Sequence, residues 1–234
     1  MFDEENAGFV VGVDYLGEEQ KFTPEGQALF VQSCHYMEQQ LAAHDRDAGV
    51  MRIHVGEGYF AEADTKEKRQ AKVKEAEHNV ETLIEAISKY KSESTGEADV
   101  QIRVGHVTHA NEDQIRRLTA LGVHIEVNIG SNLSTNAIES LDKHPLLAML
   151  YHDAEISINT DAGGVMNTDL DKEYQHVSNI IDLYKAGDMK LKIGDETLAY
   201  DELPADVQKR FSVDYIEEQA KKHHRHERDN NSGN

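Results

Sequence analysis

Short runs rich in Val and Ile recur along the chain, and each run ends in glycine or polar residues. β-branched residues are favoured in strands, and short apolar runs of this kind are typical of strands buried in a parallel sheet. The pattern predicts five strands, over Phe9–Tyr15, Val50–Val55, Val100–His106, Val123–Asn128 and Glu155–Thr160.

The segments between these strands carry apolar residues three or four positions apart, which is the period of an amphipathic helix. Thr23 followed by Pro24 predicts a helix start, and Asp64 with Glu67 predicts another. The predicted helices cover residues 24–44, 64–90, 111–121, 137–151 and 169–186. Because strand and helix alternate, we expect right-handed βαβ units and one parallel sheet, which is an α/β fold.

Two later segments depart from this alternation. Met189–Leu203 alternates in polarity around Gly194 and Asp195, which predicts a small hairpin outside the main sheet. The end of the chain is charged and poor in apolar residues. We therefore divide the chain into a βα portion over 1–188, a hairpin with C-terminal helices packed on it over 189–220, and a charged tail over 221–234 that we expect to be disordered.

Composition excludes several classes of protein. The 234 residues include 24 Lys and Arg against 44 Asp and Glu, a net charge of −20, so nucleic acid and anionic membranes are poor partners. The longest apolar run, Leu146 to Tyr151, is far shorter than the ~20 residues of a membrane span. Cys34 is the only cysteine, so no internal disulfide is expected. The acidic N-terminus is unlike a secretory signal, and we expect a cytoplasmic protein.

Candidate chemistry gathers where the predicted strands end. His54 and Glu57 follow the second strand, His106 ends the third, and Asp161 follows the fifth. The carboxyl ends of parallel strands meet at one rim, so we expect these side chains to converge there. Imidazole and carboxylate ligands suit Zn²⁺, which supplies hydroxide near neutral pH, while a neighbouring carboxylic acid can protonate a substrate.

The order of the motifs resembles the adenosine deaminase family, over about residues 8 to 186. That family carries Asp-Leu-Ala-Gly-Asp-Glu, His-Ala-Gly-Glu, Gly-His-Gly, Glu-Val-Cys-Pro-x-Ser-Asn and Ser-Leu-Asn-Thr-Asp-Asp segments in this order. The corresponding segments here are residues 14–19 (DYLGEE), 54–57 (HVGE), 103–106 (RVGH), 126–132 (EVNIGSN) and 157–161 (SINTD). Further similarities are His144-Pro145, Asp169-Leu170 and Glu173-Tyr174.

The resemblance implies zinc-dependent hydrolytic deamination of adenosine or a related aminopurine nucleoside, giving inosine and ammonia, with a place in purine salvage. It implies His54 and Asp161 as zinc ligands, Glu57 as the proton donor to the purine ring, and His106 as the residue that orients the attacking hydroxide. It also implies that the segment containing Asp14 and Gly17 contacts the purine. The implied fold is a (β/α) barrel of the metal-dependent hydrolase type, of which this chain carries the C-terminal five βα units, a partial TIM barrel.

Two departures from the family pattern leave alternatives open. No His-x-His precedes the first predicted strand, and Ala162 stands where the family has a second Asp that contacts the purine. Two protein ligands are fewer than the three of a usual catalytic zinc site. The chain is therefore a fragment of a longer enzyme, one part of a two-chain enzyme whose partner supplies His-x-His, or a catalytically incomplete relative that binds a nucleoside or a protein.

Overall fold

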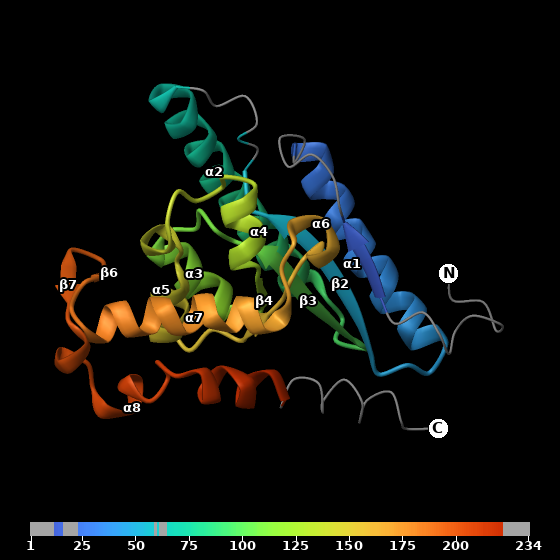
Figure 1. Cartoon of the computed structure of the whole chain (residues 1–234). Helices are drawn as coiled ribbons and strands as arrows, with labels where there is room; N and C mark the ends of the chain where they lie inside the picture. Colours follow the sequence, from blue (N-terminus) through green and yellow to red (C-terminus); the bar gives the residue numbers. More distant parts are fainter. Residues whose placement is uncertain (1–11, 16–22, 59, 61–64, 222–234) are drawn as a thin grey trace.

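The structure, a computed structural model, describes residues 12–15, 23–58, 60 and 65–221. Its centre is a sheet of five parallel strands in the order β1-β2-β3-β4-β5 (Figure 1). These strands are β1 (Gly12–Tyr15), β2 (Ala48–Val55), β3 (Asp99–His106), β4 (His124–Val127) and β5 (Ile156–Ile158). All five predicted strands are therefore present; residues 9–11 of the first lie outside the described residues.

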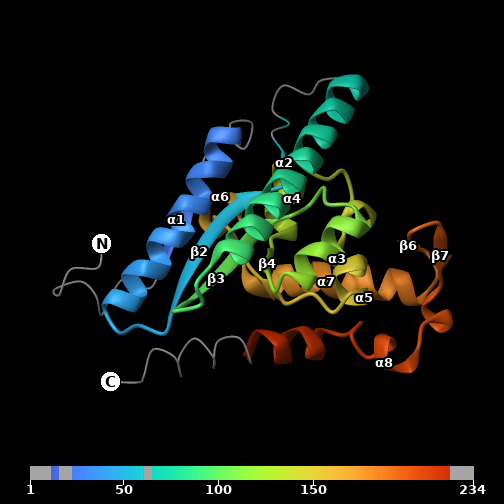
Figure 2. The same ribbon diagram turned by 180° about the vertical axis from the view of Figure 1, so that it is seen from behind.

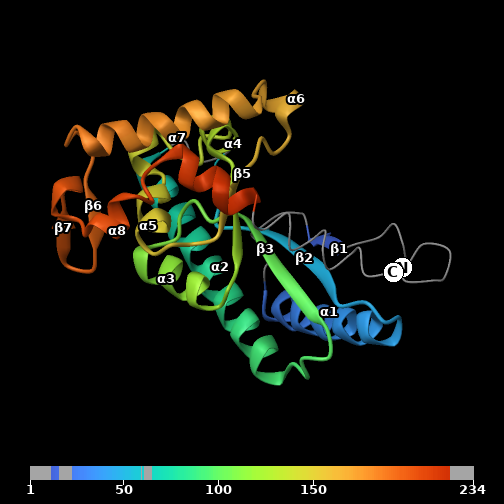
Figure 3. The same ribbon diagram turned by 90° about the horizontal axis from the view of Figure 1, so that it is seen from below.

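The order of the strands identifies the type of α/β fold. Each strand pairs with the next one along the chain, as in (β/α) barrels, whereas doubly wound sheets reverse their order at a switch point. The helices contact one another in the same succession: α1 with α2, α2 with α3, α3 with α5, and α5 with α7. Their bounds are α1 (Pro24–Ala43), α2 (Lys66–Glu93), α3 (Glu112–Ala120), α5 (Leu146–Tyr151) and α7 (Leu170–Lys185). They follow one another around the outside of the sheet in the view from below (Figure 3). The structure thus confirms the predicted α/β fold as a partial barrel.

The longer helices begin at residues whose side chains cap them. Thr23 accepts the N–H of Gly26 at the start of α1, and Asn111 and Gln114 form a reciprocal capping box at α3. Thr65 caps α2, one residue after the predicted cap Asp64, which itself lies outside the described residues. The other helical elements are α4 (Ile129–Ser134), α6 (Gly163–Met166) and α8 (Ala205–Gln208), with 3₁₀ turns at Leu141–Lys143 and Tyr200–Glu202.

The two faces of the sheet have different characters. Along β2, Met51, Ile53 and Val55 are buried, and α1, α2 and α3 cover this outer face, seen from behind in Figure 2. The alternate residues of β2, among them Arg52 and His54, point to the opposite, inner face and are only half-buried. The apolar core therefore lies between the sheet and the helices, and polar side chains occupy the inner face of the sheet.

The prediction of one helix over 137–151 is wrong. Only the 3₁₀ turn Leu141–Lys143 and α5 are helical there, because Asn136 has a left-handed φ of +57° and His144, before Pro145, is extended. Two short helices, α4 and α6, occupy stretches that the sequence pattern left without a regular element.

The segment after α7 begins with two antiparallel strands, β6 (Leu191–Ile193) and β7 (Glu196–Leu198), outside the main sheet. Tyr184 of α7 donates a hydrogen bond to the Leu198 carbonyl. Residues 213–221 are helical, and residues 222–234 lie outside the described residues. The division of the chain into units ending at residues 188 and 220 stays a prediction. No helix in the described part of the chain is long and apolar enough to cross a membrane.

Candidate active site

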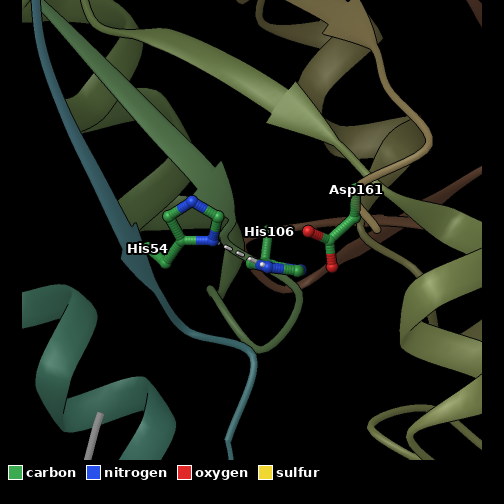
Figure 4. Close-up of side chains that lie close together, drawn as sticks. All are labelled: His54, His106 and Asp161. Carbon is green, nitrogen blue, oxygen red and sulfur yellow. Dashed lines mark hydrogen bonds between the residues drawn. The ribbon is translucent and has the colours of Figure 1, made fainter. Parts of the chain in front are cut away.

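Three of the predicted site residues lie together at the rim of the sheet. His54 lies near the end of β2, His106 is the last residue of β3, and Asp161 follows β5 by three residues. One ligand atom from each lies within 4.8 Å of the others (Figure 4). The structure therefore brings His106 into the same cluster as the two predicted zinc ligands.

The two imidazoles of this cluster are joined by a hydrogen bond, and their protons can be assigned. Asn132 Oδ1, which can only accept, lies 2.9 Å from His106 Nδ1, closer than the 3.5 Å contact from Asn128 Nδ2, so His106 Nδ1 carries its proton. His106 Nε2 is then an acceptor, 3.2 Å from His54 Nδ1, as the dashed line in Figure 4 shows. His54 in turn donates from Nδ1 and keeps a lone pair on Nε2.

The lone pair on His54 Nε2 indicates what kind of ligand the cluster can bind. His54 Nε2 is buried, has no hydrogen-bond partner among the described residues, and lies 3.6 Å from Asp14 Oδ1, which is also an acceptor. Burial, together with His106 and Arg52, lowers the pKa of His54, so the imidazole is neutral at pH 7. A lone pair facing a carboxylate is stabilised by a cation. Imidazole nitrogen and carboxylate oxygen are ligands that Zn²⁺ accepts readily. These donors fit Zn²⁺.

The backbone at the cluster is held in an unusual conformation. His106 has φ +71° and Asp161 has φ +53°, both in the left-handed region that non-glycine residues seldom adopt. Such strain concentrates at functional sites. Gly105, which pairs in register with His54, leaves space for that ring: an added Cβ would lie 3.2 Å from His54 Nδ1.

Helix α4 and the residue that caps its end hold the polar groups of the site. Ser131 donates a hydrogen bond to Asp161 Oδ2 at 2.7 Å, and Asn132 accepts from His106. Thr135 Oγ1 lies 3.1 Å from Glu57 Oε1 and 3.0 Å from the Ser131 carbonyl. Thus one short helix contacts side chains that arrive from three different strand ends.

Glu57, the predicted proton donor, is close to the histidines. Its Oε2 lies 3.5 Å from His106 Nε2, while Thr135 holds the other oxygen. The carboxyl group is partly exposed, so one of its oxygens can reach a substrate from the rim. This position is suitable for a general acid.

Of the two residues expected to contact a purine, only Asp14 can be placed. It forms an ion pair with Arg52 at 2.8 Å, and Arg52 and Arg103 both bond to the buried Glu126. A hollow of about 520 Å³ opens along this part of the inner face. Its lining includes Asp14 but not His54, His106 or Asp161, so it lies beside the cluster rather than over it. Gly17 lies outside the described residues.

The sequence profile of the adenosine deaminase family matches residues 10–211, most of the chain. The chain belongs to the adenosine deaminase family. Similar family members include an adenosine deaminase of Clostridium kluyveri, 38% identical over 77 residues, or 32% of this chain and 22% of that protein. An aminodeoxyfutalosine deaminase of Streptomyces avermitilis is 31% identical over 87 residues, or 36% of this chain and 24% of that protein. The matched segments thus span about a quarter of the length of these family members.

Two solved structures resemble the fold of the chain distantly. One is Arabidopsis ADAL complexed with IMP, with 15% identity, coverage of 74% of this chain and 58% of that chain, and a TM-score of 0.32. The other is an adenine deaminase from Arthrobacter aurescens, with 11% identity, coverage of 83% and 80%, and a TM-score of 0.33.

Four residues that hold the site were not assigned roles from the sequence: Ser131, Asn132, Thr135, and Glu173, whose carboxylate accepts the Gly130 N–H at the start of α4. Ser131, Asn132 and Glu173 stand within segments that resemble the family, yet nothing in their spacing says which side chain each contacts. The sequence could have pointed to Glu173, because this carboxylate shares the apolar, buried face of α7 with Val177, Ile180 and Tyr184. A carboxylate on an apolar helix face indicates a specific buried partner.

Proposed function

We propose that this chain carries the zinc site of a hydrolytic deaminase acting on an aminopurine nucleoside. The observation that supports it is the convergence of His54, His106 and Asp161, with Glu57 next to His106. This donor set is the one expected for a hydrolytic zinc centre, and it lies on a family fold whose members include deaminases.

In the proposed site, His54, Asp161 and His106 hold the metal. A usual catalytic zinc site has three protein ligands, and this chain supplies three. A His-x-His pair from a second chain or a further segment is therefore not needed to complete that number. Zinc, when bound, lowers the pKa of a water molecule and so supplies hydroxide near neutral pH. His106 would bind the metal through Nε2, in place of the hydrogen bond from His54, because its Nδ1–H is held by Asn132.

Glu57 is the proposed acid. It donates a proton to the ring nitrogen next to the amino-bearing carbon, which makes that carbon more electrophilic. Water adds at this carbon and ammonia leaves, so an aminopurine and water give the oxopurine and ammonia. Thr135 stabilises the carboxylate that remains on Glu57, because its hydroxyl can turn from the Ser131 carbonyl to Glu57 Oε1.

Adenosine itself is one member of the proposed substrate class. Ala162 replaces the carboxylate that the family pattern places next to Asp161, so one polar contact to the purine is missing. The similar family members include both adenosine and aminodeoxyfutalosine deaminases. A panel of adenosine, deoxyadenosine and larger 6-aminopurine nucleosides therefore identifies the substrate by comparison of kcat/KM.

The test combines zinc analysis with one substitution. The full chain should hold about one zinc, and Glu57→Gln should retain zinc and the unfolding temperature while abolishing release of ammonia. Glu139→Gln, which removes an exposed carboxylate of the same region, should leave turnover intact. Undiminished turnover in Glu57→Gln overturns the mechanism. Nucleoside binding that persists in EDTA, without turnover, would instead favour a catalytically incomplete binding protein.

A further inference from the structure

Glu173 is a fully buried carboxylate on the apolar face of α7, outside the metal cluster. Both of its oxygens accept the backbone N–H of Gly130, at 2.9 Å and 3.2 Å. Gly130 belongs to the first turn of α4, where backbone N–H groups lack partners within the helix. Glu173 therefore fixes the start of the helix that carries Ser131 and Asn132.

The same carboxylate also holds the segment that follows Asp161. Thr168 Oγ1 donates to Glu173 Oε1 at 2.8 Å, and the Thr168 N–H bonds to the Gly163 carbonyl. The two segments joined by Glu173 thus carry Asp161 and the residue that orients it, Ser131.

We propose that Glu173 is a positioning residue for the metal cluster, acting through α4 and the Asp161–Thr168 segment. This inference rests on the proposed function for its metal. In this proposal, Glu173 fixes the position of Asn132 relative to His106 and of Ser131 relative to Asp161. It contacts neither metal nor substrate.

The chain offers a matched control for a merely structural role. Glu38, also buried, accepts the Gly96 N–H at 2.8 Å and the hydroxyls of Ser94 and Thr95. It thus holds a glycine and hydroxyl residues of a loop, as Glu173 does, but that loop joins α2 to β3 at the amino-terminal end of the strand, away from His106. Loss of either carboxylate should lower stability, and only loss of Glu173 should alter the cluster.

The experiment compares Glu173→Gln with Glu38→Gln in the full chain, with zinc affinity measured by competition with a chromogenic chelator. We expect at least a tenfold weaker affinity for Glu173→Gln, as is usual when a group that orients a ligand is lost, and less than a twofold change for Glu38→Gln. Unchanged affinity in Glu173→Gln, or an equal loss in both variants, overturns the proposal.

Two further measurements keep the outcome decisive. If the unaltered chain binds no zinc, the proposed function fails, and the His106 Nδ1–H signal in NMR spectra of the metal-free chain tests the positioning alone. That signal should shift in Glu173→Gln and stay in place in Glu38→Gln; an unmoved signal in Glu173→Gln refutes the role. If Glu173→Gln does not fold, Thr168→Val replaces it and Thr95→Val serves as its control, with the same readouts.

Discussion

Asn132 Oδ1 accepts the Nδ1–H of His106 at 2.9 Å, and this contact fixes which nitrogen of His106 faces the candidate metal cluster. Both side chains are almost fully buried, so water does not compete for the bond. The unprotonated Nε2 of His106 then accepts from His54 Nδ1 and lies 3.5 Å from Glu57 Oε2. Asn132, which lies outside the cluster, thus determines which imidazole nitrogens of the cluster carry protons.

Replacing Asn132 with the similarly sized Leu should lower zinc affinity roughly 10- to 100-fold, because His106 loses the partner that holds its ring and tautomer. Chelator competition measures the affinity, and circular dichroism confirms that the chain is folded. Ser134→Ala, at an exposed position of the same helix, is the control and should bind zinc as the unaltered chain does. Equal zinc affinity in Asn132→Leu would show that the tautomer is set elsewhere.

The hydroxyl of Thr135 should matter for turnover and not for substrate binding. Thr135→Val keeps the shape of the side chain but removes the hydrogen bond to Glu57, and a bond to a charged group contributes about 1.5–3 kcal/mol. We expect kcat to fall roughly tenfold or more with KM little changed. Thr135→Ser restores the hydroxyl and should recover most of kcat, whereas equal loss in both variants would point to packing.

Gly130 is required by the close approach of Glu173. A Cβ at position 130 would lie 2.1 Å from Glu173 Oε1, so Gly130→Ala must displace the buried carboxylate from its hydrogen bonds. We expect a loss of roughly 3 kcal/mol in the free energy of unfolding, measured by urea denaturation. Gly164→Ala, in another short helix with open space at its Cβ, should be neutral or stabilising by up to about 1 kcal/mol. Equal effects at the two positions would contradict this explanation.

The strands and the long helices could be predicted because their signals are local. Val and Ile runs mark the sheet, and Thr23-Pro24 marks the start of α1. Helix α4 gave no such signal: its sequence, IGSNLS, is rich in residues that disfavour helix interiors. It is held by Glu173, more than 40 residues later in the chain.

The candidate site, like the fold, could be predicted only in part from the sequence. That His54, His106 and Asp161 converge follows from parallel strands ending at one rim. The left-handed backbone of His106 and Asp161, and the joining of the two imidazoles, depend on tertiary contacts that no spacing encodes. These contacts decide that His106 lies among the candidate ligands, a position that the family resemblance did not imply.

His144 should make the protein less stable in mild acid. Its side chain is buried, its Nδ1 accepts the N–H of Leu146 at the start of α5, and burial, with His106 and His109 nearby, lowers its pKa to about 3. In the unfolded chain its pKa is the ordinary 6.5, so between pH 6.5 and about 3 the unfolded state binds more protons than the folded state. Stability from this group is therefore fully present above pH 6.5 and falls as the pH drops through that window.

For His144 alone, the expected loss between pH 7 and pH 5 is roughly 2 kcal/mol of unfolding free energy. His144→Asn retains an acceptor for Leu146 but cannot titrate, so its unfolding free energy should fall by about that much less over the same interval. Urea denaturation at the two pH values measures the difference, and His78→Asn, at an exposed position on α2, should leave it as in the unaltered chain. An identical pH dependence in His144→Asn would mean that His144 is not held neutral by its burial, and the acid sensitivity would then have to come from other groups, such as His109, whose pKa burial lowers to about 4.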